Sequence, residues 1–104
     1  MVILVGLGQI RFLDDYFRLG QELEMHINVV NDKPYDVDDV RVKVDILGLT
    51  QLTSHNFDVD DNSNYGFFFH WIIPYNSKKG EYLVRITASN DDFKDIKYRY
   101  ITIV

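Results

Sequence analysis

Apolar and polar residues alternate with a period of two along most of this sequence. The clearest run covers residues 22–31, where Leu23, Met25, Ile27 and Val29 alternate with polar side chains. Successive side chains of a strand point to opposite faces, so this pattern predicts a strand with one buried face. Four further segments alternate in the same way, namely residues 40–47, 65–73, 81–89 and 94–104.

Weaker signals predict three more strand segments. Residues 2–5 and 9–13 are expected to form one broken strand or two short ones, because Gly6 and Gly8 allow a bend or bulge between them. A short edge strand is expected near residues 53–57. Clusters of Asp, Asn, Gly and Pro predict connections at residues 14–20, 31–34, 58–64, 74–80 and 90–92.

Seven or so short strands in 104 residues predict an all-β fold, an immunoglobulin-like antiparallel β-sandwich with Greek-key connections. The composition agrees, because one Ala and three Glu stand against eleven Val and ten Ile. This excludes helical bundles and doubly wound α/β folds. Residues 1–104 are predicted to be a single domain, either complete or cut from a larger protein.

Charge and cysteine content narrow the function classes. A formal net charge of −5 makes nucleic acid an unexpected partner. The sequence has no Cys, which excludes disulfides and thiolate zinc sites but leaves a prokaryotic cell surface open. No apolar run reaches the roughly 18–20 residues of a membrane span. Residues 1–7 are apolar but short, and they are interpreted as a first strand rather than a signal peptide.

Two segments carry a resemblance to a known family. Residues 20–46 (GQELEMHINVVNDKPYDVDDVRVKVDI) and 80–89 (GEYLVRITAS) resemble the CARDB-like and related immunoglobulin-like domains of bacterial and archaeal surface proteins. The shared features are a Gly-led strand ending in an Asn turn, a following Val-x-Val-x-Val strand, and a Gly-Glu-Tyr corner. The resemblance implies a stalk, spacer or adhesion module without catalysis, and it carries no active site.

The sequence also departs from that pattern. Residues 32–34 (DKP) replace the usual Gly after the Asn turn, and Pro74 lies six residues before Gly80 rather than beside it. The antibody-type cysteine pair is absent, and Trp71 falls on a late strand. Tyr82 does take the place of a tyrosine corner, two positions before an inward residue.

The loop at residues 58–64 (DVDDNSN) is the best metal candidate. Asp58, Asp60 and Asn62 offer oxygen ligands at alternate positions, as Ca²⁺ requires. An EF-hand is excluded because Ser63 and Phe69 stand where that loop needs Gly and Glu. The competing interpretation is a solvated turn whose side chains bond their own backbone. A second loop could add three ligands, Asp36, Asp38 and Asp39.

The sequence offers little support for a nucleotide site, a histidine metal site or a catalytic site. Gly6-x-Gly8 begins a nucleotide fingerprint, but Arg11 stands at the third Gly position and no helix pattern follows. His26, His55 and His70 form no metal-binding motif, and no nucleophile elbow is present. The protein is therefore expected not to be an enzyme. No cofactor is expected either, with calcium the one ion left open.

The aromatic run at residues 65–71 divides into two faces. Its inward members, with Tyr65 first, are expected in the core. Phe68, Ile72 and Leu83 are expected to point outward, where they would form an interface with a neighbouring domain or subunit if they cluster. The same outward expectation applies to Leu47 and to Ile101 or Ile103.

Three basic residues, Arg85, Lys97 and Arg99, are expected in one stripe on the last two strands. This stripe is interpreted as surface ion pairing rather than a nucleic-acid site.

Three functions remain open from sequence. The first is a non-catalytic spacer or interaction module of a prokaryotic cell-surface protein, with neighbouring domains, like subunits or another protein as partners. The second is a self-assembling protomer of a surface filament or layer, in which residues 1–5 or 94–104 add to a neighbour's sheet. The third is a small hydrolytic, ligand-binding or calcium-binding domain.

Overall fold

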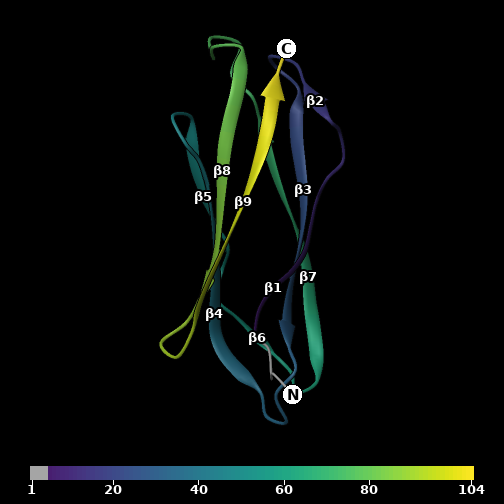
Figure 1. Ribbon diagram of the computed structural model, residues 1–104, viewed down its shortest axis with the longest axis vertical. Coiled ribbons are helices and arrows are strands. Elements are labelled where there is room, and N and C mark those ends of the chain that lie inside the picture. The colour runs from purple at the N-terminus through teal and green to yellow at the C-terminus, as the bar shows by residue number, and fades with distance from the viewer. Residues whose placement is uncertain (1–4) are drawn as a thin grey trace.

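Two β-sheets pack face to face in the computed structural model, which describes residues 5–104 (Figure 1). The described residues contain no helix, and the predicted all-β immunoglobulin-like sandwich is confirmed. The molecule is elongated, with extents of 46 × 24 × 17 Å. The strands are β1 (Val5–Phe12), β2 (Tyr16–Phe17), β3 (Glu22–Asn31), β4 (Val37–Ile46), β5 (Thr50–Thr53), β6 (Phe57–Val59), β7 (Ser63–Ile72), β8 (Gly80–Ser89) and β9 (Lys94–Ile103).

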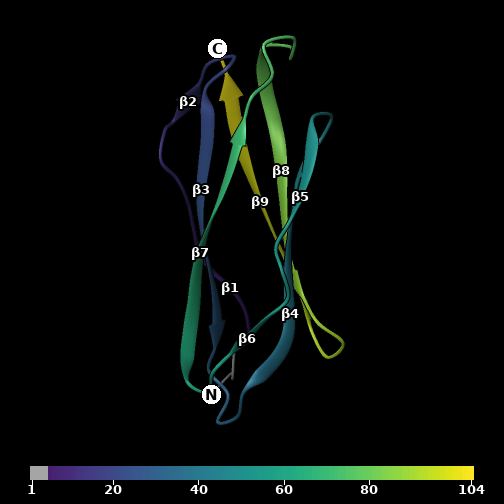
Figure 2. The ribbon, with the colours of Figure 1, turned by 180° about the vertical axis from the view of Figure 1, so that it is seen from behind.

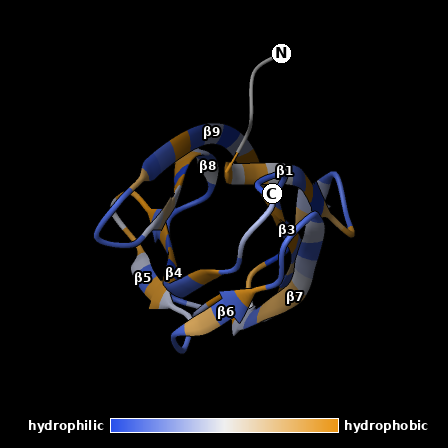
Figure 3. Ribbon diagram, turned by 90° about the horizontal axis from the view of Figure 1, so that it is seen from below, coloured by the Kyte–Doolittle hydropathy of each residue, from blue (hydrophilic) through white to orange (hydrophobic). Residues whose placement is uncertain are grey.

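The chain crosses between the sheets in the Greek-key manner. One sheet has the order β1-β3-β7, and the other has the order β2-β9-β8-β4-β5 with β6 also paired to β4. The connections β3 to β4 and β7 to β8 pass from one sheet to the other, so strands far apart in sequence become neighbours. Viewed down the long axis, the two sheets enclose a common interior (Figure 3).

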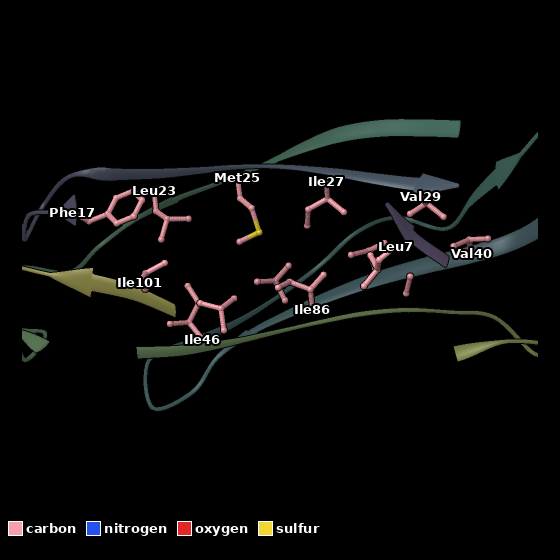
Figure 4. Close-up of a cluster of buried hydrophobic side chains, with 14 of the residues drawn as sticks. Leu7, Phe17, Leu23, Met25, Ile27, Val29, Val40, Ile46, Ile86 and Ile101 are labelled. Atoms are coloured by element: carbon pink, nitrogen blue, oxygen red, sulfur yellow. The ribbon is translucent and has the colours of Figure 1, made fainter. Parts of the chain in front are cut away.

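The interior is built from the alternating positions of β3, β4 and β8. Leu23, Met25, Ile27 and Val29 of β3 are at most 1% exposed. They face the equally buried inner residues of β4 and β8, and Figure 4 shows the side chains of the two sheets meeting. The apolar face predicted for β3 is therefore the core face, and its predicted bounds are correct.

The corner before β8 also follows the prediction. The Tyr82 hydroxyl donates a hydrogen bond to the Lys78 carbonyl oxygen at 2.5 Å. A tyrosine that bonds back to the main chain a few residues upstream is the tyrosine corner of immunoglobulin-like domains.

Short strands account for the main differences from the predicted elements. The segment predicted as a connection at residues 14–20 contains β2, whose Phe17 is 1% exposed and pairs in parallel with Ile103. The short edge strand predicted near residues 53–57 exists but lies earlier in the chain, as β5, and residues 54–56 form a loop before β6. The predicted strand at residues 2–5 lies largely outside the described residues, which begin with Val5 in β1.

One side of the sandwich is closed by contacts between β1 and β9. The predicted irregularity at Gly8 is a register shift between Leu7 and Ile10. The Leu7 amide donates a hydrogen bond to Oδ2 of Asp95 at 2.8 Å, across the gap between the sheets. Gly6 makes room for this contact, because a Cβ there would lie 2.5 Å from the same oxygen.

The predicted basic stripe of Arg85, Lys97 and Arg99 is wrong, because the three side chains do not share one face. Lys97 lies opposite Ile86 and Arg99 opposite Val84, on the face of β9 that turns toward the interior, and the Lys97 ammonium bonds the Gly8 carbonyl at 3.2 Å. Arg85 has the opposite parity and pairs with Asp45, with 3.1 Å between Nη2 and Oδ2. The three cations therefore lie on two faces, although Arg85 does form an ion pair.

Replacing Asp95 tests the closed side. Asp95→Ala removes the acceptor of the half-buried Leu7 amide and is expected to lower the free energy of unfolding by about 1–3 kcal/mol. Asp95→Asn keeps a carbonyl oxygen and should recover much of that loss. The matched control is Asp91→Ala, at an exposed position in the preceding turn. Equal urea midpoints for Asp95→Ala and Asp91→Ala would contradict this account.

Candidate functional site

The opposite side of the sandwich is bounded by β7, which has a free edge. β7 pairs with β3 over its whole length, and no other described strand pairs with it (Figure 2). The Ile73 amide bonds the Gln21 carbonyl at 2.9 Å, so Ile73 directs its main-chain groups toward the β3 side. Main-chain groups alternate in direction along an antiparallel strand. The even-numbered residues 64–72 therefore present their N–H and C=O groups to the free edge.

This edge lacks the features by which proteins usually block strand addition. β7 is ten residues long, contains no Pro, Asp, Glu, Lys or Arg, and keeps one register with β3 without a bulge. Natural edges are normally short, charged, bulged or covered. The free edge of β7 is thus open to pairing with another strand.

The outer face beside this edge carries exposed apolar side chains. Phe68 is 54% exposed and Ile72 is 64% exposed, so both point outward as the alternation predicted. The Phe68 ring packs edge-on against His26, with 3.9 Å between ring centroids.

A shallow hollow lies next to the Phe68 ring, above Gly66. Its volume is about 320 Å³, and the missing side chain of Gly66 makes room for the Asn28 side-chain oxygen, which would lie 2.7 Å from a Cβ at that position. It is walled by side chains from all three strands of the sheet, among them Gln9, Arg11, His26, Asn28 and Phe68.

The inner face of β7 is only partly covered. Tyr65, expected in the core, is 43% exposed, and Phe67, Phe69 and Trp71 are half-buried. The reason is that the facing sheet ends here in the short strands β5 and β6, which cannot cover a ten-residue strand.

Four partly covered side chains form an aromatic wall, defined here as Phe57, Tyr65, Phe67 and Phe69. The Phe57 and Tyr65 rings are stacked with 4.6 Å between centroids, and the Phe67 and Phe69 rings meet edge to face at 5.3 Å. A groove of about 310 Å³ runs between this wall and residues 53–56, which are the end of β5 and the loop after it. The wall gives β7 apolar contacts to offer on its inner face as well as on its outer face.

The predicted outward apolar residues do not form one patch. Leu83 is half-buried on β8 and Leu47 is exposed beside it, so both belong to the sheet opposite Phe68 and Ile72. The outward expectation for the last strand is wrong, because Ile101 is 3% exposed and Ile103 is 1% exposed. The alternation of apolar and polar residues predicts which face of its own sheet a residue lies on. It does not show to which of the two sheets the strand belongs.

The candidate calcium loop uses its side chains and main chain within the fold. An Asp58 carboxylate oxygen accepts a hydrogen bond from the Asp39 amide at 3.1 Å, and Asp36 accepts one from the Asp61 amide at 3.0 Å. The two predicted ligand loops are thus brought together, but they are linked by side-chain to main-chain hydrogen bonds.

Buried Asn31 fastens the same two loops. Its side-chain amide donates to the carbonyls of Tyr35, Val59 and Asp60 at 2.9–3.1 Å. Asn62, the third predicted ligand, adopts a positive φ of 49° in the turn, and its main-chain N–H donates a hydrogen bond to the Lys33 carbonyl oxygen. This arrangement matches the solvated-turn interpretation.

Two of the three histidines, His26 and His70, both lie near Glu24 on the outer face of the β1-β3-β7 sheet. His70 lies 2.5 Å from Glu22 and 3.3 Å from Glu24, and Nε2 of His26 lies 3.8 Å from Glu24. The pairing of β3 with β7 places His70 directly opposite Glu24. The sequence alone does not show that these two strands are neighbours. Within residues 5–104, no group of three or more His, Cys, Asp or Glu side chains is arranged to hold a metal ion, and no helix could cross a membrane.

Among the comparisons with known proteins, only the search of solved structures finds similar proteins. No protein-family model matches the sequence, and no curated protein matches it. The structure is similar to the CARDB domain of a Pyrococcus furiosus protein solved by NMR, with a TM-score of 0.76, 17% identity, and coverage of 96% of this chain and 94% of that one. A crystal structure of that CARDB domain in complex with di-metal ions gives a TM-score of 0.75 and 16% identity, covering 98% of this chain and 89% of that one.

The same fold also occurs inside larger proteins. A DNA-bound alkylpurine DNA glycosylase from Pseudomonas fluorescens matches with a TM-score of 0.69 and 10% identity, over 95% of this chain but only 30% of that one. Identities this low show a shared fold and nothing more. The chain has the CARDB-like immunoglobulin fold, which confirms at the level of structure the resemblance seen in its sequence.

Proposed function

We propose that this protein is a non-catalytic structural and interaction module of a prokaryotic cell-surface protein, acting as a spacer, stalk or adhesion domain. The observation that carries the proposal is the free edge of β7, which is long, uncharged and flanked by apolar side chains on both faces. The likeness to a CARDB domain supports a structural role.

The proposed mode of interaction is strand addition. An extended segment of a neighbouring domain, a like subunit or another protein would pair with the main-chain groups of the even-numbered residues 64–72. Its side chains would contact Phe68 and Ile72 outside and the aromatic wall inside. The edge proposed for pairing is thus β7, rather than the chain termini that the sequence suggested.

Substitutions at adjacent positions test the face assignment. Phe68→Asp alters a side chain that is 54% exposed and is expected to change the free energy of unfolding by less than about 1 kcal/mol. Phe69→Asp places a carboxylate against the core and is expected to cost about 3 kcal/mol or more. Urea unfolding of both variants checks the difference. The assignment fails if Phe68→Asp unfolds the domain.

Binding to intact cells tests the function. The purified, fluorescently labelled domain is added to intact cells of the organism that encodes it. Wild type is expected to bind, and Phe68→Asp is expected to bind about tenfold more weakly, a loss of about 1.4 kcal/mol. Tyr100→Asp is the control, because it changes an aromatic residue that is 65% exposed on the other sheet. Binding confined to permeabilised cells, or equal binding by wild type and Phe68→Asp, would refute the proposal.

A further inference from the structure

We infer that the strand accepted by β7 is β7 of a second copy of this chain, paired antiparallel across a two-fold axis with Phe67 opposite Phe67. This inference rests on the proposed function, for which it names the partner. It joins the two three-stranded sheets β1-β3-β7 into one sheet of six strands.

The main chain of β7 is suited to pair with itself. A two-fold axis perpendicular to the sheet keeps both cores on the same side, and it places residues of equal parity opposite each other. The even-numbered residues of the two copies then lie opposite each other, and their main-chain N–H and C=O groups point toward the other copy. Centring the axis at Phe67 pairs residues 63–71 and makes about eight main-chain hydrogen bonds.

The distribution of charge favours the free edge of β7 as the surface at which two copies of the chain pair. A chain of net charge −5 repels its own copy, so a self-pairing surface must keep acidic side chains apart. Among the described strands of eight or more residues, only β7 lacks Asp, Glu, Lys and Arg. Its histidine, His70, would face Asn64 of the second copy, which is a polar and uncharged neighbour.

The outer face is self-complementary in shape. With the axis at Phe67, Phe68 of each copy lies directly opposite Gly66 of the other. The exposed ring can lean into the hollow of about 320 Å³ above that glycine, and the symmetry fills both hollows at once. An aromatic side chain across from a strand glycine is a favourable cross-strand pair.

The inner face adds aromatic pairs in the same register. Tyr65 lies opposite Phe69 of the second copy, and the two Phe67 side chains face each other. These pairs extend the aromatic wall across the contact and cover side chains that a single copy leaves half-exposed. Moving the axis by one residue to Phe68 would place Gly66 against His70 and Asn64 against Ile72, and would leave the hollows unfilled.

Disulfide trapping tests the partner and the register together. The natural sequence has no Cys, so introduced thiols are the only ones present. In the double variant Asn64→Cys/His70→Cys, each new thiol faces its counterpart on the second copy, with Cα atoms about 5.5 Å apart, a distance that a disulfide can span. Within one copy the two positions lie about 20 Å apart along the strand and cannot cross-link.

The expected result is a disulfide-linked dimer under mild oxidation on a non-reducing gel. Asn64→Cys alone is the matched control and should stay monomeric, because its counterpart lies far along the partner strand. Asn64→Cys/Ile72→Cys reports the neighbouring register and should cross-link poorly. Equal cross-linking by all three variants, or by none of them, overturns the inference.

Filling the hollow gives a second test in the protein without cysteines. Gly66→Val puts a strand-favouring side chain where only the movable Asn28 side-chain oxygen is close, at 2.7 Å from the added Cβ. The variant is expected to fold but to dimerise about tenfold more weakly than wild type in sedimentation velocity. Dimerisation equal to wild type would contradict the two-fold contact.

The outcomes also separate this inference from the proposed function. A wild-type chain that stays monomeric from micromolar to millimolar concentration overturns the second copy as partner. Binding of that monomer to intact cells, lost in Phe68→Asp, would still support strand addition by a different protein. Loss of both results would remove the proposed function as well.

Discussion

Burial of the inner faces of β3, β4 and β8 between the two sheets is the interaction on which the rest of this structure depends. Their alternate residues are almost completely buried, and each such aliphatic side chain contributes about 1.5–3 kcal/mol. Two open sheets that bury one face each still leave strand edges at both sides. The side formed by β1 and β9 is tied by the Leu7–Asp95 hydrogen bond. On the side formed by β7, Phe57 of β6 stacks on Tyr65, but no described strand pairs with the outer edge of β7.

This asymmetry connects the fold to the proposed function. Near β7 the facing sheet ends in β5 and β6, which are four and three residues long, so a ten-residue aromatic strand remains partly uncovered. An uncharged edge of this length is a hazard for an isolated protein. Its presence is understandable if the edge is covered in the assembled state, and pairing with a second copy covers the main-chain groups, Phe68 and the aromatic wall together.

The sequence was most informative where one face of a strand is buried throughout. The bounds of β3 and the outward direction of Phe68 and Ile72 follow from alternation alone. β2 escaped prediction because two residues cannot show a period. The basic stripe was misplaced because Lys97 and Arg99 share the inner-facing side of β9, where Lys97 bonds the Gly8 carbonyl of β1, whereas Arg85 lies on the opposite face. The free edge of β7 could not be predicted from the sequence, because the order of strands in a sheet depends on long-range contacts. A local pattern of residues does not indicate those contacts.

Amide hydrogen exchange along β7 tests the central claim most directly. In dilute wild-type protein, the even-numbered amides of Gly66, Phe68 and His70 should exchange rapidly, while the odd-numbered amides of Phe67 and Phe69 stay protected by β3. Raising the protein concentration should protect the even-numbered amides selectively, because they then bond to a second copy. Even-numbered amides that remain unprotected at every concentration would contradict the account.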